Sequence, residues 1–419
     1  MLLALAIFLA TYLLISLRRL AHVPLERPAV ALLGASLMIL LGVVTPQDAI
    51  DAIDLNTILL LVGMMLVVVT LEATGLFEHI ALWVVEHSKS QRRLLLGIGL
   101  TTAVLSALVL NDAVVLFFTP IIVRSARLLR INPLPYLVVE ATTANIGSVA
   151  TEVGNPQNAY IGLASGIPFA RYALVMVPVA AACLLVASLL FLWLYRDELR
   201  KPFEAQRVAP LERDASLKQP RLLVFGLAVV ALLFVGFLLS HRLGIPLSLL
   251  ALAGGSLLVF FAPVVGKASP RVLFRRVDWS IILLFVGLFV VLKGVEVSGV
   301  LRSLFDGLET ASAGAIHEVW GLGLLASIIS NLISNVPATL LLAPLVGPDG
   351  PEQLWYALAA STTLAGNATI LGAAANIIVA EKAEEEGVAV PFWDFFRVGF
   401  PVTVATLLVA FGLLRLAVP

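Results

Sequence analysis

The sequence predicts an all-α polytopic membrane protein made of two inverted repeats, and three observations support this fold class. Of the 419 residues, 60% are hydrophobic and only 13% are charged, whereas soluble domains carry roughly 25% charged residues. Eight apolar runs reach the length of about 20 residues that a helix needs to cross a bilayer. Two stretches that begin at Asp54 and Asp278 also align without gaps.

The eight uninterrupted runs are expected to cross the bilayer as plain helices. Their ranges are 2–20, 28–45, 55–73, 170–195, 220–240, 244–262, 278–296 and 399–416. The first run is expected to remain in the protein as a span, because no basic stretch precedes it and it has no small-residue cleavage site.

Four further apolar stretches are interrupted by polar residues. Two of them, at about 94–128 and 318–347, contain paired segments of about 15 residues each and are predicted to be re-entrant hairpins. The other two, at about 135–164 and 353–380, are predicted to be spans with an unwound middle, which gives about ten full crossings. Irregular backbone is tolerated at membrane depth only where protein buries it or a watery cavity solvates it. The four breaks are therefore the candidate site.

The distribution of basic residues predicts the orientation. With the N-terminus outside, 22 of the 27 Lys and Arg residues fall in cytoplasmic loops, as the positive-inside rule requires. The count holds only if both hairpins are re-entrant. It places both termini outside the plasma (inner) membrane of a bacterial or archaeal cell, and it makes the charged segment 196–219 a cytoplasmic linker.

The repeat divides the chain into a first half at 1–195 and a second half at 220–419. "DLNTILLLVGMMLVVVTLEATG" from Asp54 aligns with "DWSIILLFVGLFVVLKGVEVSG" from Asp278, and the same offset matches Asn111 with Asn335. The predicted topology gives the two copies opposite orientations. Inverted repeats place a binding site between the copies near the midplane, an arrangement typical of secondary transporters.

The two predicted hairpin tips carry residues that begin helices. Asn111 and Asp112 stand at the first tip, and Ser334 and Asn335 stand at the second. Two half-helices would direct unpaired N–H groups and positive dipole ends toward the centre, which suits an anion or an electronegative oxygen. The alternative is that these residues only cap buried helix ends.

The two predicted unwound segments are rich in amides and hydroxyls, which could hydrogen-bond a substrate or coordinate a cation. In the first segment Gly147, Gly154 and Pro156 are expected to stop the helix. The polar candidates there are Thr151, Glu152, Asn155, Gln157 and Asn158, and those of the second segment are Thr362, Thr363, Asn367, Thr369 and Asn376. A Na⁺ site is one interpretation, through Asn111, Asn155, Asn335 and Asn376.

Four ionisable residues are predicted near or within the membrane, where such side chains are costly and often functional. Glu72 and Lys293 stand near span ends, where Glu72 would be interfacial and Lys293 would reach the surface or pair with Glu296. Asp112 and Glu152 have no such exit. Either carboxyl group could exchange a proton during transport, or bind Na⁺ while ionised.

At these residues the chain resembles the ion transporter superfamily, which includes citrate and dicarboxylate carriers, arsenite permeases and Na⁺/H⁺ antiporters. The stretches "LNDAVVLFFTPIIV", "GLFEHIALWV" and "MVPVAAACLLVASLLFLWLYRDEL" resemble arsenite permeases, and "TANIGSVATEVGNPQNAYIG" is similar to a segment of citrate carriers and anion permeases. The resemblance implies that Asn111, Asp112, Ser334 and Asn335 are tip ligands. It implies that the broken-helix walls are Asn145, Gly147, Thr151, Gly154, Asn155, Asn367, Thr369 and Asn376, and it is compatible with a homodimer.

The first tip departs from the dicarboxylate carriers, which have a Ser-Asn-Thr triplet at each tip. This chain has Asn-Asp-Ala at the first tip and Ser-Asn-Val at the second. Asp112 would repel an anion unless it is protonated or paired with a cation. The sequence therefore predicts a secondary active transporter of a small anion or an arsenite-like solute, coupled to H⁺ or Na⁺.

The alternatives are a Na⁺/H⁺ antiporter and a channel. An intramembrane hydrolase is not expected, because the predicted spans contain no paired aspartates, no Ser-His or Ser-Lys dyad and no zinc motif. The single cysteine, Cys183, excludes a multi-thiolate site. With Lys plus Arg and Asp plus Glu equal at 27, nothing indicates nucleic acid. The expected partners are the lipid bilayer and a small-molecule solute, with no cofactor beyond the coupling ion.

Overall fold

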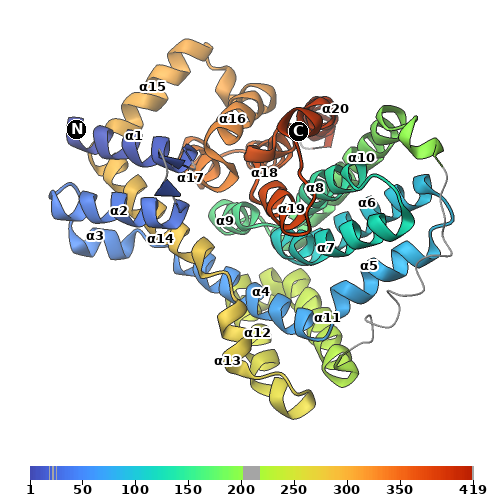
Figure 1. Ribbon diagram of the computed structural model, residues 1–419. Helices are drawn as coiled ribbons and strands as arrows, with labels where there is room; N and C mark the ends of the chain where they lie inside the picture. Colours follow the sequence, from blue (N-terminus) through green and yellow to red (C-terminus); the bar gives the residue numbers. More distant parts are fainter. Residues whose placement is uncertain (18, 21–22, 25, 202–217, 418–419) are drawn as a thin grey trace.

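The computed structural model describes residues 1–17, 19–20, 23–24, 26–201 and 218–417, and nearly all of them are helical (Figure 1). Most of the predicted linker lies outside these residues. The first half contains α1 Leu2–Ser16, β1 Arg19–Leu20, β2 Val23–Pro24, α2 Arg27–Leu40, α3 Pro46–Asp51, α4 Leu55–Ala73, α5 Leu76–His87, α6 Gln91–Leu108, α7 Asn111–Leu129, α8 Leu134–Ser148, α9 Pro156–Ser165, α10 Phe169–Leu194 and η1 Glu198–Arg200.

The second half has a matching succession of elements. It contains α11 Pro220–Leu243, α12 Leu247–Val265, α13 Pro270–Arg276, α14 Trp279–Val297, α15 Val300–Ser312, η3 Ala315–His317, α16 Val319–Ile333, α17 Asn335–Val346, α18 Glu352–Leu364, η4 Ala365–Ala368, η5 Ile370–Gly372, α19 Ala374–Glu385 and α20 Phe392–Ala417. The two strands form a two-residue antiparallel ladder, and the fold is that of an all-α polytopic membrane protein as predicted.

Within the described residues, six helices are long and apolar enough to cross a bilayer: α4, α10, α11, α12, α14 and α20. The runs predicted at 2–20 and 28–45 form shorter helices, α1 of 15 residues and α2 of 14. The expectation that both reach the full span length is wrong. α1 ends in front of the β1–β2 ladder, and α2 ends at Leu40, after which the chain turns toward α3.

The first interrupted stretch also differs from its predicted lengths. α6 has 18 residues and α7 has 19, rather than about 15 each. The helices are longer because helical backbone continues past the apolar core into charged turns that contain Arg92 and Arg127. The break itself is short, with Val109 and Leu110 between the helices.

α4 and α14 have the same length and the same ends. Each has 19 residues, and each begins after an aspartate whose carboxylate caps it: Asp54 accepts from Asn56 N and Asp278 from Ser280 N, both at 3.0 Å. Each is followed by a glycine with positive φ, Gly75 at 80° and Gly299 at 76°. The shared sequence pattern therefore produces two helices with matching termini.

Each of these helices packs against a helix from the other half. α4 lies against α12, and α14 lies against α2. Glycines allow the close approach: a Cβ at Gly63 would stand 2.3 Å from the Ala251 backbone, and one at Gly287 would stand 2.6 Å from the Ala31 backbone. In Figure 1, α2 and α14 lie on one side of the molecule and α4 with α12 on another, and the remaining helices of both halves lie beside these two groups.

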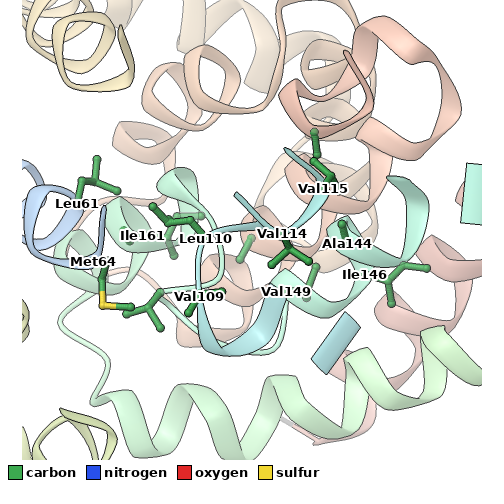
Figure 2. Packing of buried hydrophobic residues seen from close by; sticks show 14 of the residues in the cluster. Leu61, Met64, Val109, Leu110, Val114, Val115, Ala144, Ile146, Val149 and Ile161 are labelled. Atoms are coloured by element: carbon green, nitrogen blue, oxygen red, sulfur yellow. The ribbon is translucent and has the colours of Figure 1, made fainter. Parts of the chain in front are cut away.

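Apolar side chains hold the first hairpin tip in place. Figure 2 shows Val109 and Leu110 of the α6–α7 turn among the side chains of Leu61 of α4, Ile161 of α9 and Val149, which follows α8. All of these residues are buried. The polar residues that follow the turn therefore start from a fixed position.

The predicted unwound segments are present, and they differ from each other. Helical backbone stops between α8 and α9 over residues 149–155, whereas α18 passes into two short 3-10 helices, η4 and η5, before α19 begins. Gly147 lies so close to α6 that a Cβ would stand 2.0 Å from the Ala103 carbonyl oxygen. Its role in the fold is close packing of α8 on α6.

Candidate functional site

Asn145 connects the two halves of the chain through its amide. Its nitrogen donates to the side-chain oxygens of Asn367 at 2.9 Å and Asn376 at 3.0 Å, and its oxygen accepts from Asn111 Nδ2 at 3.1 Å. Asn145 is fully buried. The first tip, the first broken helix and the second broken helix therefore meet at one side chain.

Asn155 has two structural functions. Its oxygen accepts from Asn158 N at 2.8 Å and so caps α9, and its nitrogen donates to Ser148 Oγ at 2.9 Å and to Thr363 Oγ1 at 3.3 Å. Gln157 also donates to Thr363 Oγ1, at 3.2 Å. These bonds join the first unwound segment to α18.

The second tip begins at a strained residue. Ser334 has φ of 75°, a left-handed conformation that non-glycine residues rarely adopt. Its hydroxyl accepts a hydrogen bond from Arg27 Nη1 at 3.0 Å. The Asn335 side-chain nitrogen donates to the carbonyl oxygens of Thr362 at 2.9 Å and Gly372 at 2.8 Å. In this orientation the Asn335 side-chain oxygen accepts from Gln157 Nε2 at 3.2 Å.

A cavity of about 50 Å³ lies between the two tips. Its walls come from both halves of the chain and combine a guanidinium, a carboxylate and several amides. The lining residues are Arg27, Asn111, Asp112, Asn145, Pro156, Gln157, Ile281, Leu284, Ser334, Asn335, Val336, Pro337, Ala373 and Ala374. Within the described chain, Asn111 Oδ1 is buried without a hydrogen-bond partner, so the wall offers a vacant acceptor.

Asp112 also borders a second, more apolar cavity of about 90 Å³, which extends to Arg276 and Asp278. The charges that act most on the Asp112 carboxylate are those of Asp278, which is repulsive, and Arg27, which is attractive. Asp112 therefore stands between the polar cavity and the end of the molecule where α13 meets α14.

Several predicted site residues lie outside the lining of the polar cavity. Thr151 donates to the Ala107 carbonyl oxygen at 2.6 Å, the Gly154 carbonyl accepts from Asn111 N at 2.9 Å, and Asn158 Nδ2 donates to the Ser148 carbonyl oxygen at 3.0 Å. Asn376 Nδ2 donates to the carbonyl oxygens of Gly366 and Thr369. These residues support the walls from behind.

The four amides predicted for Na⁺ do not line one space. Asn111 and Asn335 line the polar cavity, whereas Asn155 and Asn376 direct their nitrogens to Ser148 and to the second unwound segment. Among the described residues, no three His, Cys, Asp or Glu side chains are grouped as a metal site would require.

The interfacial carboxylates have basic partners. Glu72 pairs with Arg276, and Lys293 Nζ pairs with Glu296 at 3.1 Å, which confirms the expected pairing of Lys293. Glu152 differs from these residues, because it is fully buried.

The sequence analysis missed two residues. Arg27 stands directly before the predicted span 28–45, yet it lines the polar cavity beside Ser334. Glu140, fully buried on α8, shares a 3.1 Å contact with the Thr119 hydroxyl of α7. A carboxylate inside the apolar run "YLVVEATTAN" was a visible signal, whereas nothing local to Arg27 marks its neighbour 307 positions away.

Comparisons with known proteins agree with this architecture. A family model described as citrate transporter matches residues 12–360. The 46 kDa membrane protein of Mycobacterium leprae is 31% identical over 97% of this chain and 96% of its own length. The uncharacterized transporter Rv2685 of Mycobacterium tuberculosis has the same identity and coverage. The rice (Oryza sativa subsp. japonica) silicon efflux transporter LSI3 is 30% identical over 91% of this chain and 90% of its own length.

These matches confirm the predicted resemblance to the ion transporter superfamily. They indicate a multi-pass membrane protein that moves a small solute across the bilayer, and not an enzyme. The chain belongs to the citrate transporter family.

Proposed function

We propose that this chain is a secondary active transporter of a small oxyanion or an uncharged hydroxylated oxyacid of the arsenite type, coupled to protons. The observation that carries the proposal is the polar cavity between the two tips, which brings Arg27, Asp112 and the tip amides of both halves together. The halves 1–195 and 220–419 would act as inverted repeats that open this site alternately to the two sides of the membrane.

The size of the cavity favours a small solute. A water molecule needs roughly 10–15 Å³ by this measure. A cavity of about 50 Å³ therefore holds about four such groups, which matches an oxyacid with three or four oxygens around one central atom. Citrate is several times larger and would require a wider conformation. A relative of 30% identity has the name silicon efflux transporter, and dissolved silicon is an uncharged hydroxylated oxyacid.

The chemistry of the walls supports both charge states of such a solute. The Arg27 guanidinium donates hydrogen bonds, and Asn111 Oδ1 and the Asp112 carboxylate accept them. While Asp112 is ionised, its charge offsets that of Arg27. When Asp112 takes up a proton, the site loses one negative charge and attracts an anion more strongly. Proton binding and solute binding are thereby linked.

Both cavities extend toward Arg27 and Arg276, which the distribution of basic residues places at the cytoplasmic end. This supports an inward-facing state as the form described, with both termini on the outer side of a bacterial or archaeal plasma membrane. A homodimer, formed through helices that flank the site, is compatible with the proposal.

The test is solute-dependent proton flux into liposomes that contain the purified protein and a pH-sensitive dye. Arsenite, silicic acid, small oxyanions and citrate are offered in turn under an imposed pH gradient, with protein-free liposomes as the control. We expect flux with a small oxyacid, loss of proton coupling in Asp112→Asn, and reduced transport in Asn155→Ala, which removes the α9 cap. Wild-type transport in both variants would contradict the proposal.

A Na⁺/H⁺ antiporter is the second candidate, and the position of Asp112 beside both cavities favours it. The same liposomes decide between the two functions. Dequenching of the dye on addition of Na⁺, with no transportable anion or oxyacid present, would establish the antiporter instead.

A further inference from the structure

Glu152 is a fully buried carboxyl group in the unwound segment between α8 and α9, and the polar cavity does not use it. Within the part of the chain that the structure describes, neither of its carboxylate oxygens has a hydrogen-bond partner. An ionised carboxylate without partners at membrane depth is very costly. The group is therefore neutral in this conformation, which requires a proton on one oxygen.

A glycine makes room for this carboxyl group. A Cβ at Gly162 of α9 would stand 2.4 Å from Glu152 Cδ, so any larger residue would collide with the head of the side chain. Glu140 provides a useful contrast, because it is equally buried but contacts the Thr119 hydroxyl. The space around Glu152 accommodates its carboxyl group without supplying a structural partner for it.

A line of titratable groups leads from Glu152 to one surface of the molecule. The rings of Tyr172 on α10 and Tyr356 on α18 pack together with centroids 5.7 Å apart, and the Tyr172 hydroxyl donates to the Val149 carbonyl oxygen at 3.4 Å, three residues before Glu152. The Tyr356 hydroxyl lies 3.5 Å from Glu352 Oε2, and Arg171 Nε pairs with the same oxygen at 2.6 Å. The side chains of Glu352 and Arg171 are 34% and 59% exposed.

This surface lies at the end opposite the one that Asp112 approaches. Glu352 and Arg171 stand at the beginnings of α18 and α10, which the distribution of basic residues places outside. The second cavity beside Asp112 ends at Arg276 and Asp278, at the cytoplasmic end. The two carboxyl groups therefore face opposite sides of the membrane.

We propose that Glu152 is a second proton-binding site, loaded from the outer face at the side of Tyr172 and Tyr356, and that it works in series with Asp112. The inference rests on the proposed proton-coupled transport. A proton carried by water from the outer face forms an O–H bond on a Glu152 carboxylate oxygen as the O–H bond of its hydronium carrier breaks, and the reverse transfer to water releases it.

The test compares Glu152→Gln with Glu140→Gln, a matched control of the same chemistry and burial. Two transport modes are measured in liposomes: accumulation driven by a pH gradient, and counterflow of solute at equal pH on both sides. We expect Glu152→Gln to reduce accumulation at least tenfold while counterflow stays within about twofold of wild type. Counterflow also shows that the variant is folded and binds solute. Glu140→Gln is expected to keep both modes.

Infrared spectroscopy of the purified protein tests the protonation of Glu152 without any transport. A band of a protonated, non-hydrogen-bonded carboxyl group is expected in the wild type at neutral pH and is expected to be absent in Glu152→Gln. The proposal is overturned if the band is identical in both proteins, if Glu152→Gln accumulates solute at the wild-type level, or if Glu140→Gln shows the same loss.

Failure of the proposed function would look different. In that case the wild type would give no solute-dependent proton flux at all, and the infrared band would still decide whether Glu152 holds a proton. Solute flux that follows a Na⁺ gradient and is lost in Glu152→Gln would contradict the proton assignment and make Glu152 a Na⁺ ligand.

Discussion

The two hairpin tips occupy matching places in the two halves, but they differ in charge. Asn111 begins α7 and Asn335 begins α17, so an amide stands at the same point of each tip. Asp112 follows the first amide, whereas Val336 follows the second, and the positive charge beside the second tip comes from Arg27 of α2. The tips share this asparagine, whereas the residue before it differs in conformation: Leu110 has φ of −58° and Ser334 has φ of 75°.

Asn145 joins the first hairpin tip to the second half of the chain, so its substitution should have the largest effect on transport and stability. Asn145→Ala removes three buried hydrogen bonds and leaves their partners unsatisfied. We expect transport to fall below about a tenth of wild type and the free energy of unfolding to drop by roughly 2–3 kcal/mol, at about 1 kcal/mol for each bond. Liposome flux and thermal unfolding measure the two effects.

The control for this prediction is Asn132→Ala. Asn132 accepts a single bond from Leu134 N in an exposed turn, so its loss should leave transport unchanged. Wild-type transport by Asn145→Ala would show that the two halves do not communicate through this amide.

Arg27 and Asp112 test whether the charge difference between the tips selects the solute. Arg27→Gln removes a charged donor from the cavity, and a hydrogen bond to a charged group is worth roughly 1.5–3 kcal/mol. We expect KM to rise about 10- to 100-fold, while Arg302→Gln on the exposed face of α15 leaves it unchanged. The double variant Arg27→Gln/Asp112→Asn sharpens the result, because an uncharged solute should regain affinity there and an anion should not.

Gly147 at the end of α8 and Gly366 in η4 should differ in their tolerance of added volume. A Cβ at Gly147 would meet rigid backbone at 2.0 Å, whereas one at Gly366 would meet the Ala373 side chain at 2.8 Å. We expect Gly147→Ala to lower the free energy of unfolding by about 1–3 kcal/mol and Gly366→Ala to lower it less. Gly412→Ala, in the open face of α20, should be stabilising by about 0.5–1 kcal/mol. An equal loss at Gly147 and Gly366 would contradict the difference.

The smallest expected effect concerns the ion pair between Arg124 of α7 and Glu386. Glu386 pairs with Arg124 of α7, and this hydrogen bond holds the pKa of Glu386 below its ordinary value. Because the pKa of Glu386 is lower in the folded state, the ion pair stabilises the fold at pH values above the ordinary glutamate pKa. This stabilisation is lost as the pH falls through the folded-state pKa. Because Arg124 is 60% exposed, solvent screening limits the gain to roughly 0.5 kcal/mol.

Glu386→Gln should therefore be slightly less stable than wild type at neutral pH, and the difference should vanish below about pH 4. Thermal unfolding across this pH range measures it, with the exposed Glu384→Gln as the control. A difference that grows on acidification would have the wrong sign for this ion pair.

Local patterns predicted much of the fold. The range 55–73 is α4 to the residue, and the matched Asn111 and Asn335 do begin helices. Apolar run length and helix-start residues act over a few positions, so one sequence is enough to find them. The amphipathic helices α5 and α15 were not predicted, because they are too short or too polar to be recognised as membrane spans.

The residues that line the cavity were harder to predict, because the lining depends on contacts between segments that are distant in the sequence. Residues assigned to one wall, such as Thr151 and Asn376, instead hold the backbone behind it. Arg27 reaches the cavity because α2 packs on α14, and α14 also packs on α17, the helix that follows Ser334. Such proximity follows from helix packing that no short pattern records.

The packing of α4 on α12 and of α2 on α14, each pair joining the two halves, also affects how the protein folds during synthesis. α4 leaves the ribosome roughly 200 residues before the end of α12, the helix it packs against. At about 5–20 residues per second, this delay lasts on the order of 10–40 s. During synthesis the face of α4 that contains Gly63 is exposed to lipid or to the insertion machinery until α12 is made. Neither half is a self-sufficient folding unit, and cotranslational assembly is complete only when the second half arrives.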